Sequence, residues 1–324
     1  MQKLWLGQKK LSYFRYSCLA YLIFFFNFFP LASSEMLNKI PKQDKKQLED
    51  LFNYFTTNST FPYTLFGNKP VSWICITLPR FPEFKSSQKV IHRSTNKSSL
   101  WKKWQVWKKY EKQFPLIKYH FIEETESNRK DIFIINKKYF ISIVNQHQDL
   151  FESILHQKVS GESLLEEMEK QSSFRKVIQN NDLLLGILLG FGEHNSSLYQ
   201  QREDLEKLYK LYQSMLIADT PAFQDLENKA EKITNILMPF NDSCNSYLIV
   251  GSPSFMVDAT NQETRTLKSN YEKLQHEISK LYHSRNVLEI TINQLTSEKE
   301  SVEFEPRIYN FIKEILRLHF QVIN

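Results

Sequence analysis

Glycine is scarce in this chain: only 7 of its 324 residues are glycine, whereas average usage of roughly 7% predicts about 23. Folds that bind nucleotides through glycine-rich loops, such as the Rossmann and P-loop classes, are therefore disfavoured. Hydrophobic residues make up 41% of the chain and charged residues 24%. The chain can thus bury a core, and its composition is not that of a disordered protein.

The first 34 residues have the layout of a secretory signal peptide. They contain four basic residues and no acidic one, and an apolar stretch rich in phenylalanine ends in small residues just before Glu35. We therefore expect export across an inner membrane, to the periplasm, the envelope or the outside, with residues 35–324 as the mature protein. The alternative is an uncleaved signal that anchors the chain through residues 16–32, although this run is shorter than the about 20 apolar residues of a typical span.

The mature chain is expected to fold as a helix-dominated α+β protein, with a small sheet of three or four strands and a long C-terminal helix. Apolar residues recur at helical spacing through most of the sequence. We expect one domain over residues 35–324, or two packed lobes over 35–136 and 137–324. Strands are expected where β-branched and aromatic residues gather, at residues 71–78, 118–123, 131–136 and 247–257.

Two connections between these elements have recognisable signals. Residues 61–70 contain a Gly-Asn pair and end in proline, so we expect a turn-rich connector there. A polar stretch separates the strands at 118–123 and 131–136, which predicts a hairpin with a longer loop.

The long helix is expected to run without a break from about residue 261 to residue 300. Apolar residues along it alternate spacings of four and three, and the pattern is broken only at Arg285. This is the pattern of a coiled coil, and it could join two copies of the chain into a homodimer through residues 267–295. The same pattern also suits packing against another helix of the same chain.

The strongest local anomaly is a helix that combines tryptophan with lysine, here called the basic Trp helix. Three of the five tryptophans lie within seven residues, and residues 85–118 hold ten basic residues and a single acidic one. Helical spacing places most of the aromatic side chains on one broad face and most of the lysines on the other. The candidate binding residues are Trp101, Trp104, Trp107, Lys102, Lys108, Lys109 and Lys112.

A helix of this kind suits an anionic membrane surface, because lysines meet lipid phosphates while indoles lie at the headgroup boundary. A protein partner is a second reading of the same helix. Nucleic acid is less favoured, since the chain is expected to be exported. The alternative is a helix that packs its tryptophans into the core and leaves its lysines in solvent.

No catalytic residue, metal ligand or cofactor is predicted. The chain has no GxSxG, HExxH or EF-hand motif and no cysteine spacing typical of zinc. Residues 186–192 hold three of the seven glycines, but no Lys-Ser/Thr pair follows, so a tightly packed helix is expected rather than a phosphate loop. Cys75 and Cys244 could form a disulfide in an exported protein, or remain two buried thiols.

Three short stretches carry a resemblance. The sequence FPYTLFGNKP at residues 61–70, LGILLGFG at residues 185–192 and the nearby Asn195 resemble an uncharacterised family of exported proteins from Chlamydia-like, amoeba-associated bacteria. The resemblance implies a host-associated bacterial origin and no known activity. We therefore expect a non-enzymatic interaction protein of the envelope or host-facing surface. The alternatives are an enzyme without a recognisable local motif and a signal-anchored inner-membrane protein.

Overall fold

The structure, a computed structural model, describes residues 31–78, 95–214, 221–239, 250–251, 253, 255–283 and 286–297. Within these ranges the chain is a helix-dominated α+β protein, as predicted, and its strands form two small sheets rather than one. Most of the predicted signal segment, all of residues 240–249 with Cys244, and Arg285 lie outside the described residues.

The central element is a three-stranded antiparallel sheet in the order β1-β3-β2. Strand β1 covers Val71–Thr77, β2 covers Tyr119–Glu126 and β3 covers Arg129–Asn136. The central strand, β3, reads Asp-Ile-Phe-Ile-Ile over residues 131–135, and all five residues are buried. A strand with such an apolar run is expected to be covered on both faces, and this one is.

The β2–β3 hairpin closes more tightly than its polar sequence suggests. Pairing continues out to Glu126 opposite Arg129, so only Ser127 and Asn128 form the turn. Ser127 has a φ of 53°, the left-handed conformation that such a tight turn requires. The expected longer loop is therefore wrong, because Glu126 and Arg129 form an ion pair across the hairpin and extend the ladder.

One face of the sheet packs against helices from both ends of the described chain. They are α2 (Leu31–Asn38), α3 (Lys42–Asn58), α4 (Phe61–Phe66), α5 (Thr95–Tyr110) and α14 (Val287–Thr296). Their apolar side chains form a first core with Ile132 and Ile134 of β3. Helix α4 replaces the expected connector, and Pro62 stands in its first turn, where a proline is tolerated.

The other face is covered by a run of short helices. They are α6 (Lys137–Gln146), α7 (Gln148–Leu155), α8 (Gly161–Gln171), α9 (Phe174–Val177) and α10 (Asp182–Leu188). Phe133 and Ile135 of β3 belong to this second core. Side-chain caps separate the helices: Ser160 opens α8 and Asn181 opens α10, where its side chain accepts from the Leu184 backbone N–H.

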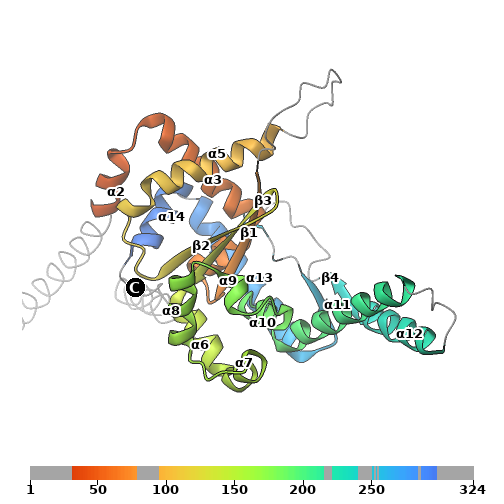
Figure 1. Cartoon of the computed structure of the whole chain (residues 1–324). Helices are drawn as coiled ribbons and strands as arrows, with labels where there is room; N and C mark the ends of the chain where they lie inside the picture. The colour runs from red at the N-terminus through yellow and green to blue at the C-terminus, as the bar shows by residue number, and fades with distance from the viewer. Residues whose placement is uncertain are drawn as a thin grey trace, which may run out of the picture.

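The remaining elements lie beside this layered body. Helices α11 (Glu193–Ser214) and α12 (Pro221–Ile236) run next to each other and extend away from the sheet (Figure 1). Strands β4 (Leu237–Pro239) and β5 (Met256–Asp258) pair with each other, so the strand expected at 247–257 is described only from residue 256. Helix α13 covers Gln262–His283.

The predicted long helix is broken in two. Helix α13 ends at His283, and α14 begins at Val287 after Asn286, whose side chain accepts from the Leu288 and Glu289 backbone N–H groups. The apolar positions of the heptad pattern pack within the chain: Ile278 lies in a third core, whereas Ile292 lies in the first core. This packing agrees with the intramolecular alternative rather than with a continuous coiled coil.

Candidate functional site

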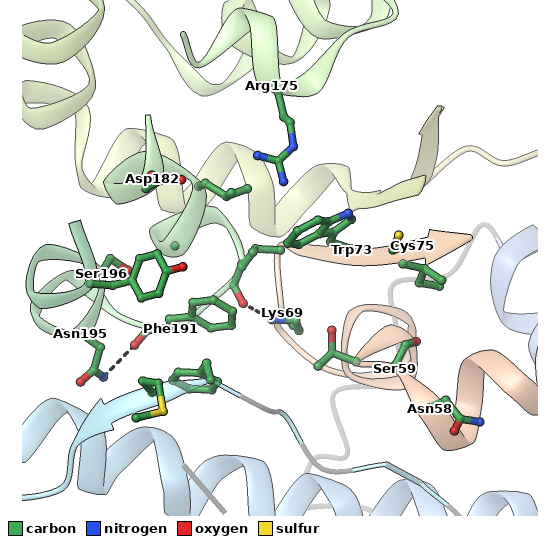
Figure 2. A pocket seen from close by; sticks show the side chains of 18 of the residues that line it. Asn58, Ser59, Lys69, Trp73, Cys75, Arg175, Asp182, Phe191, Asn195 and Ser196 are labelled. Atoms are coloured by element: carbon green, nitrogen blue, oxygen red, sulfur yellow. Dashed lines mark hydrogen bonds between the residues drawn. The ribbon is translucent and has the colours of Figure 1, made fainter. Parts of the chain in front are cut away.

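A cavity of about 590 Å³ opens beside the β1 edge of the sheet. Its walls come from β1, the end of α3, the starts of α10 and α11, and the segment before β5 (Figure 2). The volume falls within the range of about 300–1,000 Å³ that is usual for small-molecule sites. Three of its lining residues, Lys69, Trp73 and Arg175, carry donor groups that the described chain leaves incompletely paired.

Lys69 is the most unusual residue of this cavity. It lies between α4 and β1 with only 2% of its surface exposed, and its Nζ donates to the Leu189 carbonyl oxygen. The amine lies 5.2 Å from the centre of the Phe191 ring and 5.9 Å from that of Tyr271. Among the described residues no carboxylate forms an ion pair with it. Burial alone lowers the pKa of Lys69 to about 7.

The turn after α10 brings the chain close enough to hold this amine. Gly190 has a φ of +71°, and a Cβ at this position would lie 2.9 Å from the Tyr271 hydroxyl oxygen. Only glycine accepts both the left-handed backbone and the close approach. The Tyr271 hydroxyl donates to the Gly190 carbonyl at 3.2 Å, which fixes the turn against α13.

Arg175 approaches the same cavity from α9. Its guanidinium carbon lies 4.7 Å from the centre of the Trp73 ring, and its Nε lies 4.0 Å from a carboxylate oxygen of Asp131. Asp131 is 1% exposed and also lies 3.5 Å from the Arg129 Nε. Two basic residues therefore share one buried carboxylate, and Arg129 also pairs with Glu126, so the charges of this cluster are close to balanced.

Among the lining residues of the cavity, the buried polar atoms without a partner in the described structure are donors, whereas Oδ1 of the neighbouring Asp131 is an unpaired acceptor. The Trp73 indole N–H and the Arg175 Nε–H are buried without a hydrogen-bond partner in the described structure. By contrast, Asn195 is satisfied within the protein, since its amide donates to the Phe191 carbonyl and its oxygen accepts from the Asp258 backbone N–H. Unpaired buried donors are costly and favour a ligand that brings acceptors.

Aromatic side chains form a flat, apolar part of the walls, next to polar residues such as Ser59, Thr60 and Ser196. Phe191 and Phe255 stack with their ring centres 4.2 Å apart, and both line the cavity together with Trp73 and Tyr199. Asp182 is the single acidic residue among the lining residues. The cavity thus combines aromatic surfaces with two basic side chains, the composition of a site for an aromatic or apolar anion.

The glycine-rich stretch supports this wall by packing. A Cβ on Gly186 would lie 2.4 Å from the Ser196 Oγ, so α10 and α11 approach more closely than any other residue would allow. Gly192 has a φ of +85° and precedes α11, whose first backbone N–H groups, at Glu193 and His194, donate to the Glu263 carboxylate. The stretch is therefore a packing device, as the sequence predicts.

The basic Trp helix corresponds to α5 and directs its tryptophans inward. Trp104 and Trp107 are fully buried in the first core, and Trp101 is half-buried. Lys102, Lys109 and Lys112 are exposed, while Lys108 is half-buried and lies 3.0 Å from a carboxylate oxygen of Glu123. Lys109 pairs with Asp44 at 2.9 Å. This is the arrangement of the core-packing alternative, and it removes two indoles from any membrane-facing surface.

The remaining predicted site residues are not brought together. Cys75 is exposed on β1, opposite Asp131 of β3, and Cys244 lies outside the described residues, so the disulfide stays a prediction. His194 and Asp258 lie 3.0 Å apart and link α11 to β5. Over the described ranges, no cluster of three or more His, Cys, Asp or Glu side chains could hold a metal ion. No helix in those ranges is long and apolar enough to cross a membrane.

Comparison with known proteins adds no relative to this picture. No family model, no curated protein and no solved structure matches the chain. The resemblance to exported proteins of Chlamydia-like bacteria therefore stays a prediction, and the function has to be argued from the geometry of the cavity.

Proposed function

We propose that this protein binds a small organic anion with a flat, apolar body in the cavity beside β1. The observation that carries the proposal is the buried Lys69 amine, which lines the cavity and has no ion-pair partner among the described carboxylates. Burying an unpaired ammonium group costs several kcal/mol in a folded protein. An anionic ligand would supply the missing partner and offset this cost.

The other donors support the same ligand class. Arg175 adds a permanent positive charge, and its Nε–H and the Trp73 indole N–H each lack an acceptor among the described residues. A carboxylate has two oxygens and about four acceptor positions, which suits several convergent donors. The aromatic walls would cover the apolar part of the ligand.

The proposed location of the protein rests on its N-terminal sequence rather than on the cavity. Export is supported by the signal-like residues 1–34, so we propose a ligand-binding protein of the periplasm, envelope or exterior. Binding to an anionic membrane through the basic Trp helix has less support, because Trp104 and Trp107 are buried and Lys108 and Lys109 are paired with acidic residues.

The test is a titration with matched probes followed by tryptophan fluorescence and calorimetry. Indole-3-acetate, indole-3-ethanol and tryptamine share a flat ring and differ in the charge of the side chain. We expect the carboxylate to bind, the alcohol to bind at least tenfold more weakly, and the amine not to bind. Equal binding of the alcohol and the carboxylate would contradict the proposal.

A pair of variants locates the binding site. Lys69→Met keeps the alkyl chain and removes the amine, so it should weaken carboxylate binding by roughly 10- to 100-fold, the value of a hydrogen bond to a charged group. Lys210→Ala on α11 is the matched control, because the Lys210 side chain is 76% exposed and far from the cavity lining. Unchanged binding by Lys69→Met would place the ligand elsewhere.

A further inference from the structure

We propose that Lys69 is a covalent attachment site, at which the amine condenses with an aldehyde or ketone group of an anionic ligand to form an imine. This inference rests on the proposed function and deepens it, because it names the reactive group of the ligand. It is argued from the surroundings of one buried amine that lines the cavity. Binding of a simple anion would use the charge of this amine but not its reactivity as a nucleophile.

The environment of Lys69 favours a nucleophilic amine. The side chain is almost fully buried, two aromatic rings flank the nitrogen, and among the described residues the amine has one polar contact, the Leu189 carbonyl oxygen. A nearby carboxylate would hold a lysine in its charged form, but the described chain places none within ion-pair distance. A neutral amine can keep its hydrogen bond to Leu189 and still present a lone pair.

The balanced reaction consumes one carbonyl and releases one water. The Lys69 nitrogen attacks the carbonyl carbon, a carbon–nitrogen bond forms, and a proton passes from nitrogen to oxygen to give a carbinolamine. The carbon–oxygen bond then breaks as the oxygen takes up one proton from solvent and leaves as water, and the nitrogen keeps its second hydrogen, so the product is a protonated imine. No oxidant or reductant is needed, because the oxidation state of the carbon does not change.

The same contacts would stabilise the product. A protonated imine carries one N–H, which can donate to the Leu189 carbonyl in place of the amine. Its positive charge would lie over the faces of Phe191 and Tyr271, at the 5–6 Å range of cation–π interactions. In the free protein, Phe191 and Tyr271 lie beside an amine whose charged form is disfavoured by burial. In the protonated imine they would lie beside a cation whose charge is delocalised over nitrogen and carbon.

Arg175 indicates the second feature of the ligand. In Figure 2, Lys69 and Arg175 lie on either side of Trp73, and both line the cavity. A ligand whose carbonyl reaches Lys69 could therefore direct a carboxylate toward Arg175 and lay its body along the Trp73 ring. The favoured ligand is an aromatic aldehyde that also carries an anionic group, or a keto acid, which carries its own carboxylate.

The experiment uses the intact protein with 4-carboxybenzaldehyde and sodium cyanoborohydride near neutral pH. Reduction of the imine gives a stable secondary amine, which peptide mapping by mass spectrometry assigns to a residue. We expect one main adduct, on Lys69, with the mass of the probe less one oxygen atom. Lysines of ordinary pKa have on the order of a thousandfold less neutral amine at this pH, so Lys69 should be labelled at least tenfold faster than they are.

Two further probes separate this inference from the proposed function. 4-Methylbenzoate is the same anion without a carbonyl, and benzaldehyde is the carbonyl without the anion. If 4-methylbenzoate binds but the aldehyde labels Lys69 no faster than exposed lysines, the covalent inference fails and the binding function stands. If 4-methylbenzoate does not bind and no adduct forms, both fail. Slower labelling by benzaldehyde than by the anionic aldehyde would support the role of Arg175.

Discussion

At the scale of single residues, Lys69 makes folding depend on pH. The folded-state pKa of Lys69 is about 7, against an unfolded value of 10.5. Between these values the unfolded chain binds more protons than the folded one, so the free energy of unfolding rises with pH. Tyr271, whose ring centre lies 5.9 Å from the amine, is a titratable neighbour, and burial raises its pKa. Arg175 and Asp182 are the other charged residues that line the cavity.

The prediction is a gain in stability of about 2 kcal/mol from Lys69 between pH 7 and pH 9. Lys69→Met should abolish this gain and be more stable than the wild type at pH 7, because a buried amine without an ionic partner is replaced by an apolar side chain. Urea denaturation at several pH values measures both effects. An equal pH slope in the two proteins would mean that the Lys69 amine is solvated or paired.

At the scale of elements, the contact between α10 and α11 depends on one missing side chain. Gly186→Ala would normally stabilise a helix interior by about 1 kcal/mol. Here the new methyl group meets Ser196 Oγ at 2.4 Å and Ser196 Cβ at 2.8 Å, so we expect a loss of roughly 1–3 kcal/mol instead. Thermal or urea unfolding gives the sign of the change directly.

A second variant shows whether the clash is the cause. Ser196→Gly removes the atoms that the new methyl group would strike. Combined with Gly186→Ala, it should cost less than the sum of the two single changes, by 0.5 kcal/mol or more. Strictly additive losses would mean that Gly186 acts through the backbone rather than through this contact.

The break between α13 and α14 depends on the cap at Asn286. Asn286→Ala removes the side-chain oxygen that accepts from Leu288 N–H at 2.9 Å and Glu289 N–H at 3.2 Å, and it should cost about 1 kcal/mol of stability. Asn286→Ser preserves a capping oxygen and should recover most of the loss. A serine variant as unstable as the alanine variant would point instead to the Asn286 contact with Glu49.

Much of the element pattern could be predicted because it depends on local periodicity. The β1 and β3 strands and the α3 helix follow directly from the spacing of their apolar residues. The interruption at Asn286 could not, because the apolar spacing stays in phase on its two sides and the asparagine cap that opens α14 gives no signal in the heptad pattern. The tight turn at Ser127 was missed because the ion pair of Glu126 and Arg129 extends the ladder into a stretch that reads as a loop.

The cavity was not predictable for a different reason. Lys69 and Trp73 come from one segment, whereas Arg175 and Phe191 lie more than 100 residues later in the sequence, and each residue is ordinary in its local context. A buried lysine differs from an exposed one only through tertiary packing, so composition and spacing carry no signal for it. The basic Trp helix, by contrast, is recognisable in the sequence because its signal is local. Its Trp104 and Trp107 are buried in the first core.

At the scale of the whole molecule, the described residues of the first core all lie downstream of the predicted cleavage point before Glu35. Helix α2 begins at Leu31 and so spans the predicted cleavage point before Glu35. Its described core residue, Leu37, and Ile40 just after the helix both lie downstream of that point. Cleavage would therefore leave these core contacts in place.

We predict that a chain beginning at Glu35 unfolds at the same temperature as the full chain, within a few degrees. Leu37→Ala in either chain should cost about 3 kcal/mol, because the side chain is 3% exposed and packed. N-terminal sequencing of the protein from its native host would test the processing itself, with Glu35 expected as the first residue. A large loss of stability on removing residues 1–34 would mean that this segment belongs to the fold.

The position of α14 also has a consequence for the timing of folding. Leu288, Ile292 and Leu295 complete a core that is otherwise built from residues 37–134. This core cannot close until nearly all of the described chain has left the ribosome, because α14 is the last of the described helices. Contacts of such long sequence separation slow folding. For a chain that crosses a membrane unfolded, a late final contact would extend the interval in which it remains competent for transport.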